Sequence, residues 1–216
     1  MCLDDLNRYG AFVPLMQNKA LAELVGILLG DGSFYVSGYN NEVDIALDTK
    51  DLNYKNYVKT LLQKSTNAYV YEKYAKNSNC VHLRISRKLI TIELLELSLK
   101  KAGNKINNKV TIPPWIWTNK SFIKACVRGL IDTDGSLYRL KPQWPNLFQL
   151  SFKNNDKVLL RDTRRAFLVL GFHPSRIFGN RIVVTQQEDI CRYINLIGTK
   201  NDTHLKECEL FTKTYC

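Results

Sequence analysis

The stretch that decides the fold occurs twice. Residues 24–35 read LVGILLGDGSFY, residues 127–138 read VRGLIDTDGSLY, and the two align without a gap. In each copy an apolar, helix-like segment ends in Asp-Gly, so that Asp31 and Asp134 occupy equivalent places 103 residues apart. Self-similarity at a fixed distance is typical of a repeated structural unit. The sequence therefore predicts a chain built from two copies of one unit.

The repeat continues downstream of each segment. Residues 43–47 and 148–152 alternate apolar and polar side chains, which predicts strands with one buried face. Each strand is followed by an acidic residue and a helix-like segment. These acidic residues, Asp51 and Asp156, lie 105 positions apart, close to the spacing of the aspartate pair. Such constancy indicates duplication rather than chance.

Each half then has a second hairpin and a closing helix. The hairpin strands are expected at residues 69–74 and 81–85, and at residues 176–178 and 181–185. The closing helices are expected at residues 89–101 and 187–197. The predicted fold is α+β, with two pseudo-symmetric halves that each run helix, two strands, helix, two strands, helix. We place the halves at residues 1–105 and 106–216, with a linker at about residues 104–120 where Pro113-Pro114 breaks any helix.

The charge of the chain favours a polyanionic partner. Its 31 Lys and Arg residues outnumber 20 Asp and Glu residues, for a net charge of +11. A compact protein this basic attracts nucleic acid first and an anionic membrane surface second. No stretch is long enough to cross a membrane, and residues 1–10 lack the apolar run of a signal peptide. We therefore expect an intracellular protein whose six cysteines, none in Cys-x-x-Cys spacing, are reduced thiols and not zinc ligands.

Small residues follow one face of each repeated helix. Gly26 and Gly30 are four positions apart, as are Gly129 and Thr133, so each pair shares a face. Small side chains on one face let two helices approach closely, and the natural partner of each helix is the other copy. The sequence therefore predicts a helix pair with Asp31 and Asp134 side by side at its end.

Two carboxylates at that position are unfavourable by themselves. The C-terminal end of a helix carries partial negative charge, and the two acids also repel each other. A divalent cation relieves both effects, and Mg²⁺ prefers carboxylate and carbonyl oxygens together with water. The alternative is that Asp-Gly merely ends a helix and begins a hairpin. Either copy alone favours that alternative, whereas two copies in the same context favour a metal site.

These motifs resemble the signature of the LAGLIDADG homing endonucleases. The stretch Ile112–Ile116, which leads into the second copy, is also typical of that family. The resemblance spans nearly the whole chain. It implies two αββαββα halves in a monomer, with the motif helices at the centre and the strands forming a saddle over double-stranded DNA. It also implies a long target, pseudo-palindromic or asymmetric.

The resemblance further implies a metal-dependent double-strand cut that leaves 3′ overhangs. By position, Asp31 and Asp134 are the acidic metal ligands, and the carbonyls of Gly30 and Thr133 complete part of the coordination. The implied metal is Mg²⁺, for which Mn²⁺ substitutes, whereas Ca²⁺ binds without supporting cleavage. Lys153, at the end of its strand, is the implied basic residue near the scissile phosphate.

The two copies are unequal. Leu29 stands where the second copy keeps Asp132, at a position that is not a metal ligand in the family. Thr133 is bulkier than the usual small residue, and we expect it to loosen the helix contact or to rotate one half slightly. Asp48 occupies the position of Lys153 in the first half, where Gln or Lys is more usual. This asymmetry predicts that the two DNA strands are not cut identically.

The outward faces of the strands are expected to contact DNA. Arg and Gln can pair with base edges, and Lys more often meets phosphates. In the first half the candidates are Tyr35, Ser37, Asp48, Tyr71, Lys73, His82, Arg84 and Ser86. In the second half they are Arg139, Lys141, Gln143, Gln149, Ser151, Arg176, Arg181 and Gln186.

Three other functions compete with DNA cleavage. An RNA maturase, which assists intron splicing on the same fold, would keep the basic saddle but would not need both aspartates. The same holds for a DNA-binding regulator that has lost cleavage. Asp31 and Asp134 are both present, which favours the nuclease. An intein is disfavoured because the chain ends Thr214-Tyr215-Cys216 and not in His-Asn.

Overall fold

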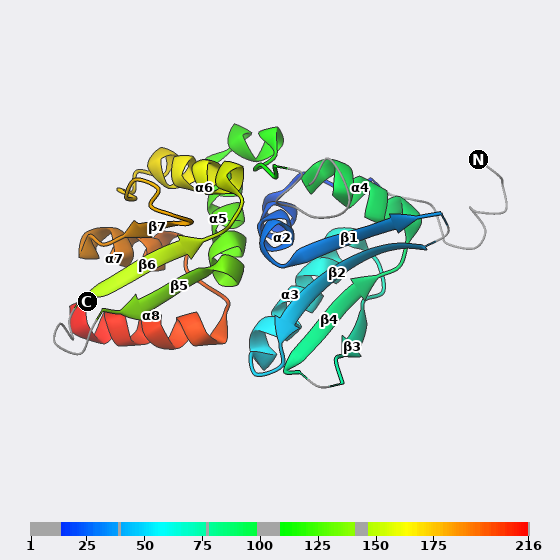
Figure 1. The fold of residues 1–216 in the computed structure, drawn as a ribbon, viewed down its shortest axis with the longest axis horizontal. Helices are drawn as coiled ribbons and strands as arrows, with labels where there is room; N and C mark the ends of the chain where they lie inside the picture. The colour runs from blue at the N-terminus through cyan, green and yellow to red at the C-terminus, as the bar shows by residue number, and fades with distance from the viewer. Residues whose placement is uncertain (1–13, 39, 77, 99–108, 141–146, 216) are drawn as a thin grey trace.

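Two central helices and two flanking antiparallel sheets make up the molecule (Figure 1). The computed structural model describes residues 14–38, 40–76, 78–98, 109–140 and 147–215. Two residues expected to contact DNA, Lys141 and Gln143, lie outside this part of the chain. The α+β fold predicted from the duplicated pattern is confirmed.

The first half begins with a central helix. Its elements are α2 (Lys19–Gly30), β1 (Gly32–Ser37), β2 (Asn40–Asp48), α3 (Leu52–Thr66), β3 (Tyr71–Tyr74), β4 (Cys80–Ile85) and α4 (Lys88–Ser98). Asn18 begins α2, because its side chain accepts a hydrogen bond from the backbone N–H of Leu21 at 2.9 Å. α3 ends at Asn67, whose φ of 49° is a left-handed conformation that asparagine tolerates.

The second half repeats this order, but it has one strand fewer, a 3₁₀ turn before its central helix and a further helix at its end. Its elements are η1 (Pro114–Thr118, a 3₁₀ turn), α5 (Lys120–Asp134), β5 (Gly135–Arg139), β6 (Phe148–Lys153), α6 (Lys157–Val169), β7 (Arg181–Val184), α7 (Gln187–Leu196) and α8 (Asp202–Tyr215). Asn119 caps α5 by accepting from the N–H of Ser121 at 2.8 Å. Asp156 caps α6 by accepting from the N–H of Val158 at 2.7 Å. Both caps satisfy N–H groups that have no partner within their helix.

Each sheet buries one face and leaves the other open. The first sheet has the order β1-β2-β4-β3 and the second the order β5-β6-β7. The register pairs Phe34 with Val43 and Val43 with Ile85, and all three are buried. Asp44, on the other face, lies opposite Arg84. The helices pack against the buried faces, so that both open faces carry the polar side chains of the strands.

The predicted strand at residues 176–178 is wrong. The N–H of Ser175 donates to the carbonyl of Val183 at 2.8 Å, but the N–H of Val183 donates to the Ser175 hydroxyl at 3.1 Å. A side chain thus takes the place of a backbone carbonyl and interrupts the ladder. Beyond it, only Phe178 forms a bridge, to Arg181. The second sheet is therefore one strand narrower than the first.

Helix α8 was not predicted. It buries His204, Cys208 and Phe211, a stripe one turn apart on a single face. Phe211 packs edge-on against Phe148 of β6, with the ring centroids 5.2 Å apart. At the start of α8, the carboxylate of Asp202 accepts from the N–H of Asn53 in α3 at 3.1 Å. α8 therefore completes the core of the second half and joins it to the first.

Two further features of the molecule are its lack of an apolar spanning helix in the described part of the chain and the state of its cysteines. Within the described ranges, no helix is both long and apolar enough to span a bilayer. Cys80, Cys126 and Cys208 carry free thiols. Burial raises the pKa of the Cys126 thiol, and burial together with Asp132 raises that of Cys208 to about 11. These two thiols stay protonated at neutral pH and behave as apolar core groups.

Candidate active site

The two central helices meet backbone to backbone at their glycines. A Cβ on Gly26 would lie 2.2 Å from the carbonyl oxygen of Cys126, and one on Gly129 would lie 2.4 Å from that of Glu23. Both distances are far inside van der Waals contact. Glycine at both positions therefore allows α2 and α5 to approach this closely.

A third contact lies nearer the ends of the helices. A Cβ on Gly30 would lie 2.0 Å from Oγ1 of Thr133 and 2.6 Å from its Cβ. The Thr133 hydroxyl is 3.0 Å from the carbonyl oxygens of Gly129 and Leu130, so its orientation is held by its own helix. Thr133 was expected to loosen this contact or to rotate one half slightly, and that expectation stays a prediction. Thr133 fills the space that Gly30 leaves open.

A buried ion pair crosses the same interface and was not predicted. Arg128 donates through Nε to Glu23 Oε1 at 2.8 Å and through Nη2 to Oε2, while the Tyr57 hydroxyl donates to Oε1 at 2.6 Å. The Glu23 side chain is 3% exposed. Burial alone lowers the pKa of Arg128, but its bonds to Glu23 outweigh burial and raise it. Glu23, a single charged residue inside the apolar run of α2, was the signal that could have revealed this pair.

The two aspartates lie at adjoining helix ends. Asp31 caps α2, and Asp134 is the last residue of α5. Each directly follows a member of the Gly30–Thr133 contact, so the close approach of those residues brings the aspartates together. Both carboxylates are half-buried at the negative ends of their helices. The arrangement concentrates negative charge where a cation would stabilise it.

A glycine turns the chain into a strand immediately after each aspartate. A Cβ on Gly32 would lie 2.6 Å from the carbonyl oxygen of Leu28, and one on Gly135 would lie 2.5 Å from that of Ile131. Strands β1 and β5 therefore start tight against the last turn of α2 and α5. The open face of each sheet begins beside its aspartate.

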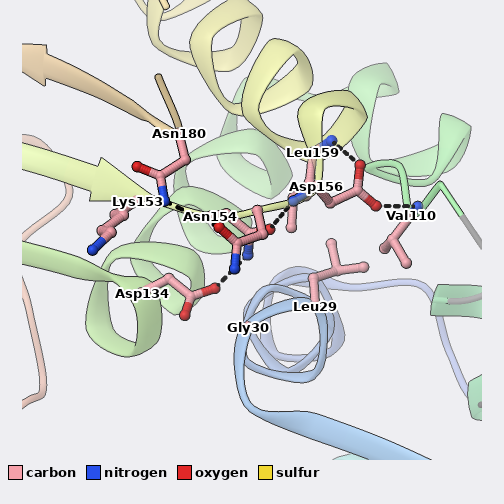
Figure 2. Close-up of a pocket in the computed structure, with 10 residues that line it drawn as sticks. Leu29, Gly30, Val110, Asp134, Lys153, Asn154, Asp156, Leu159 and Asn180 are labelled. Carbon is pink, nitrogen blue, oxygen red and sulfur yellow. Dashed lines mark hydrogen bonds between the residues drawn. The ribbon is translucent and has the colours of Figure 1, made fainter. Parts of the chain in front are cut away.

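A hollow of about 250 Å³ opens next to Asp134 (Figure 2). Leu29 and Gly30 of α2 line one side, and the turn of residues 153–156 after β6 lines another. Within it, the amide Nδ2 of Asn154 donates to Oδ2 of Asp134 at 2.8 Å. This bond orients the Asp134 carboxylate. Asn154 was not among the predicted site residues.

Backbone bonds hold Asn154 in place. Its N–H donates to the carbonyl of Asn180 at 2.9 Å, and its Oδ1 accepts from the N–H of Asp156 at 2.8 Å. The first half has the equivalent backbone bond, from Thr49 to the carbonyl of Asn79 at 3.1 Å. The side chain of Thr49 carries no amide that could donate to an aspartate, as that of Asn154 does. The two halves therefore differ in how this turn meets the helix end.

The residues at the ends of β6 and β2 differ as well. Lys153 is exposed, lines the hollow and lies on the same side of it as Asp134 (Figure 2). Asp48 is exposed at the end of β2, and its carboxylate accepts from the N–H of Lys50 at 2.9 Å. A positive group thus stands in the second half where a negative one stands in the first.

Asp132 and Leu29 serve the core. Asp132 is 2% exposed and accepts from the Thr199 hydroxyl and from the N–H of Lys200, the latter at 2.9 Å. Its carbonyl accepts from the amide of Asn201 at 3.1 Å. Asp132 therefore holds the segment that leads into α8, whereas Leu29 packs into the apolar core.

The open face of the first sheet carries acids among its basic residues. Nδ1 of His82 lies 2.9 Å from Oδ2 of Asp44, and Nη2 of Arg84 donates to the same oxygen at 3.2 Å. Asp44 was not among the predicted contacts, and it orients two residues that were. The other candidates on this side are exposed: Tyr35, Ser37, Tyr71, Lys73 and Ser86.

The open face of the second sheet is more basic. On this face Arg181 lies opposite Lys153 in the register. Arg139 was predicted to lie on this face, but the register pairs it with buried Phe148 on the face that packs against the helices, with its guanidinium 5.6 Å from the ring centroid. The Tyr138 hydroxyl donates to the side chain of Gln149. Gln149 and Ser151 are half-buried, and Gln186 is exposed. Arg176 is also exposed, but it lines a separate hollow against α6.

The donor groups at the helix ends fit a hard cation. Among the described residues, no three His, Cys, Asp or Glu side chains gather to form a metal cluster by themselves. Two carboxylates and the carbonyl groups of the last helical turns form an oxygen-only donor set. Mg²⁺ binds through few protein oxygens and keeps several waters, so this donor set suits it.

Sequence comparison matches the second half to a known family. Residues 121–198 match the model of the LAGLIDADG-like domain. No curated protein matches the sequence.

Structural comparison extends the likeness to most of the chain. I-DmoI in complex with DNA and Mn is 18% identical, with 83% of this chain and 96% of that chain covered and a TM-score of 0.60. The LAGLIDADG meganuclease I-AabMI bound to uncleaved DNA is 12% identical, with 89% and 90% covered and a TM-score of 0.55. Full-length DUF199/WhiA from Thermatoga maritima is 13% identical, with 93% and 62% covered and a TM-score of 0.56. The resemblance carried by the two motifs is confirmed at the level of the fold.

Proposed function

We propose that this chain, whose fold is that of the LAGLIDADG homing endonucleases, is a site-specific endonuclease that breaks both strands of DNA. The observation that carries the proposal is the helix pair. Two segments of matching sequence contact each other at Gly30 and Thr133 and end in Asp31 and Asp134. An open, polar sheet face starts beside each aspartate, so a duplex lying on both faces would cross the aspartate pair.

The proposed reaction is hydrolysis of one phosphodiester bond in each strand. The carboxylates of Asp31 and Asp134 and the carbonyls of Gly30 and Thr133 would hold Mg²⁺, which supplies an activated water and positive charge against the phosphate. Each aspartate serves one strand, which gives a double-strand break with short 3′ overhangs. Asn154 keeps the Asp134 carboxylate oriented, and Lys153 sets a positive charge near the phosphate that is cut.

The proposed metal preference follows from the oxygen donors. Mn²⁺ accepts the same ligands and should substitute for Mg²⁺. Ca²⁺ tolerates more ligands and longer distances, so it should support DNA binding without cleavage. I-DmoI has been crystallised with DNA and Mn and with DNA and Ca, and one of its variants with DNA and Mg, which supports testing these three ions.

The proposed target is a long duplex without perfect symmetry. The first sheet has Asp44 and Asp48 on the face where the second has Lys153 and Arg181. Faces of different charge read different bases and hold different phosphates. Because both halves lie in one chain, a monomer would cover the whole target.

A cleavage selection tests this function. A randomised duplex library is incubated with the protein in Mg²⁺, the cut products are sequenced, and the selection is repeated with Mn²⁺ and with Ca²⁺. We expect enrichment of one long sequence, cut on both strands in Mg²⁺ and Mn²⁺. In Ca²⁺ the same sequence should be bound and left intact. Failure to cut any sequence in Mg²⁺ or Mn²⁺ would contradict the proposal.

Nucleic-acid binding without cleavage is the second candidate. The same fold occurs in DUF199/WhiA, and binding needs the open sheet faces but not the aspartates. If the nucleic acid that is bound is intron RNA, this candidate function is that of an RNA maturase. Enrichment of a bound sequence, DNA or RNA, that is not cut in Mg²⁺ or Mn²⁺ would favour it.

A further inference from the structure

A second hollow, of about 560 Å³, lies between α6 and the segment that precedes β7. Among the described residues, four arginines line it and no acidic residue does. Its lining residues are Arg161, Arg164, Arg165, Leu168, Arg176 and Ile177. We call it the arginine hollow.

The arginine hollow lies on the helical side of the second half. α6 buries Leu159, Leu160 and Phe167 in the core beneath the second sheet. Arg161 and Arg165 are exposed on the other side of this helix, which runs along the outer edge of the molecule beside β7 (Figure 1). A duplex lying on the open sheet faces would therefore leave most of this hollow uncovered.

Three of the four guanidinium groups are held in position. Nε of Arg164 donates to the carbonyl of Ser175 at 2.8 Å, and Nε of Arg161 donates to the carbonyl of Lys157 at 3.2 Å. The guanidinium of Arg165 lies 4.7 Å from the ring centroid of Trp117. Each contact engages one edge or one face of a planar group that carries five N–H donors. The remaining donors are thereby oriented in advance, which lowers the entropy lost on binding a ligand.

The acids of the described chain do not neutralise this charge. None of the four arginines forms an ion pair with a carboxylate within the described ranges. Asp162, the acid nearest in sequence, accepts instead from the Thr111 hydroxyl and from the N–H of Ile112, the latter at 3.0 Å. The hollow therefore keeps a concentrated positive potential that attracts multivalent anions.

Phosphate groups of a nucleic acid fit this surface best. A guanidinium fork pairs with two phosphate oxygens at once, and several such forks suit a chain of phosphates. Phe178, directly after Ile177, is 79% exposed, and Leu168 is 46% exposed. An exposed ring beside arginines is a surface on which unpaired bases stack. We propose that the arginine hollow is a second nucleic-acid site, which binds the phosphate backbone of a single strand while the sheet faces hold a duplex.

The test measures binding of a labelled single strand to protein whose sheet faces are saturated with unlabelled duplex DNA. The probes are an RNA and a DNA of the same sequence and about 20 nucleotides, longer than the few nucleotides such sites cover. The variant is Arg161→Gln with Arg165→Gln, and the matched control is Lys206→Gln with Lys213→Gln. Those two lysines are exposed on α8, so the control removes the same charge elsewhere on the helical side.

We expect the arginine variant to bind the single strand about tenfold more weakly at low salt and to lower the salt slope by about 1.4, for two lost phosphate contacts. The lysine control should bind like the unchanged protein. A preference between the RNA and DNA probes identifies which strand the site takes. Equal binding by the two variants would overturn the proposal, as would stronger displacement of the strand by polyglutamate than by polyphosphate, which would point to an acidic protein partner. The readout does not require cleavage, so it stands apart from the proposed endonuclease function.

Discussion

Thr133 occupies the space that a side chain on Gly30 would need, so that the two central helices interlock one residue before each aspartate. The position of the candidate active site therefore depends on the absence of a side chain at Gly30 and on the presence of the Thr133 side chain. Because the contact lies beside the aspartates, changes in helix packing there should reach the site as well.

Adding a methyl group at Gly30 should destabilise the protein, and changing Thr133 should partly relieve the effect. In Gly30→Ala the new Cβ would meet Oγ1 and Cβ of Thr133, and overpacking of this kind costs about 1–3 kcal/mol. Gly30→Ala combined with Thr133→Gly should recover part of that loss. Urea unfolding of the two single variants and the double variant measures the coupling.

Gly26→Ala is the matched control for that cycle. Its Cβ would meet the backbone carbonyl of Cys126, which no side-chain substitution can remove. We expect a loss at least as large as that of Gly30→Ala and no recovery with Thr133→Gly. Recovery of both alanine variants by Thr133→Gly would mean that the contact is not local.

Replacing either aspartate should stop double-strand cleavage and leave DNA binding in place. Asp31→Asn and Asp134→Asn remove a negative metal ligand but keep the size of the side chain. Without that charge the cation is held weakly, while the loss of a carboxylate does not weaken attraction to phosphates. Cleavage of the selected target and its anisotropy-measured affinity check both points. Full cutting by either variant would contradict the assignment.

Asn154→Asp should impair one strand more than the other. The amide of Asn154 donates to Asp134 at 2.8 Å, and a carboxylate in its place would repel it. The acceptor for the N–H of Asp156 is kept, so the turn should persist. We expect nicked product to accumulate on a target labelled on both strands. Thr49→Asp, at the equivalent place in the first half, is the comparison, and identical nicking by both would exclude a specific role for Asn154.

Removing Arg128 should cost more stability than removing any exposed charge of α5. Arg128→Ala would leave the buried carboxylate of Glu23 without its main partner, which costs about 3–5 kcal/mol. Lys120→Ala, exposed at the start of the same helix, should change the free energy of unfolding by less than about 0.5 kcal/mol. Chemical denaturation of both variants at neutral pH provides the comparison. Equal losses would show that Glu23 finds another partner.

The stability of the first half should fall in acid because of Glu72. Lys59 and Lys55 donate to its carboxylate at 2.7 and 2.9 Å and lower its pKa from 4.5 to about 2. Since the folded state holds this pKa below its unfolded value, the stabilisation is complete above pH 4.5 and is lost as the pH falls to about 2. In Glu72→Gln this part of the loss of stability below pH 4.5 should be absent.

The measurement for Glu72 is the free energy of unfolding from pH 7 to pH 2. The difference between the unchanged protein and Glu72→Gln should shrink steadily below pH 4.5. Glu188→Gln, an exposed carboxylate on α7, serves as the control. A constant difference for Glu72→Gln would mean that its carboxylate is not held by the two lysines.

Much of the fold could be predicted because it depends on local pattern and on duplication. Alternating residues such as those at 43–47 predict a half-buried strand wherever they occur, and two matched copies predict two matched units. The segment at residues 176–178 was predicted as a strand and is not one, because the Ser175 hydroxyl takes a hydrogen bond that the ladder needs. Helix α8 went unpredicted since its buried stripe is narrow and its partner, Phe148, is distant in the sequence.

The sequence by itself determined that two Gly-containing helices, each ending in Asp-Gly, would pair, because glycine spacing and repetition are written in the order of residues. Only the tertiary structure decided which side chains meet across that pair. Glu23 joins Arg128, and Asn154 joins Asp134, through contacts between residues 105 and 20 positions apart. Such contacts depend on the path of the chain through space, which folding of the whole molecule creates and local periodicity does not encode. The arginine hollow has the same origin, since it forms only where α6 packs beside the segment before β7.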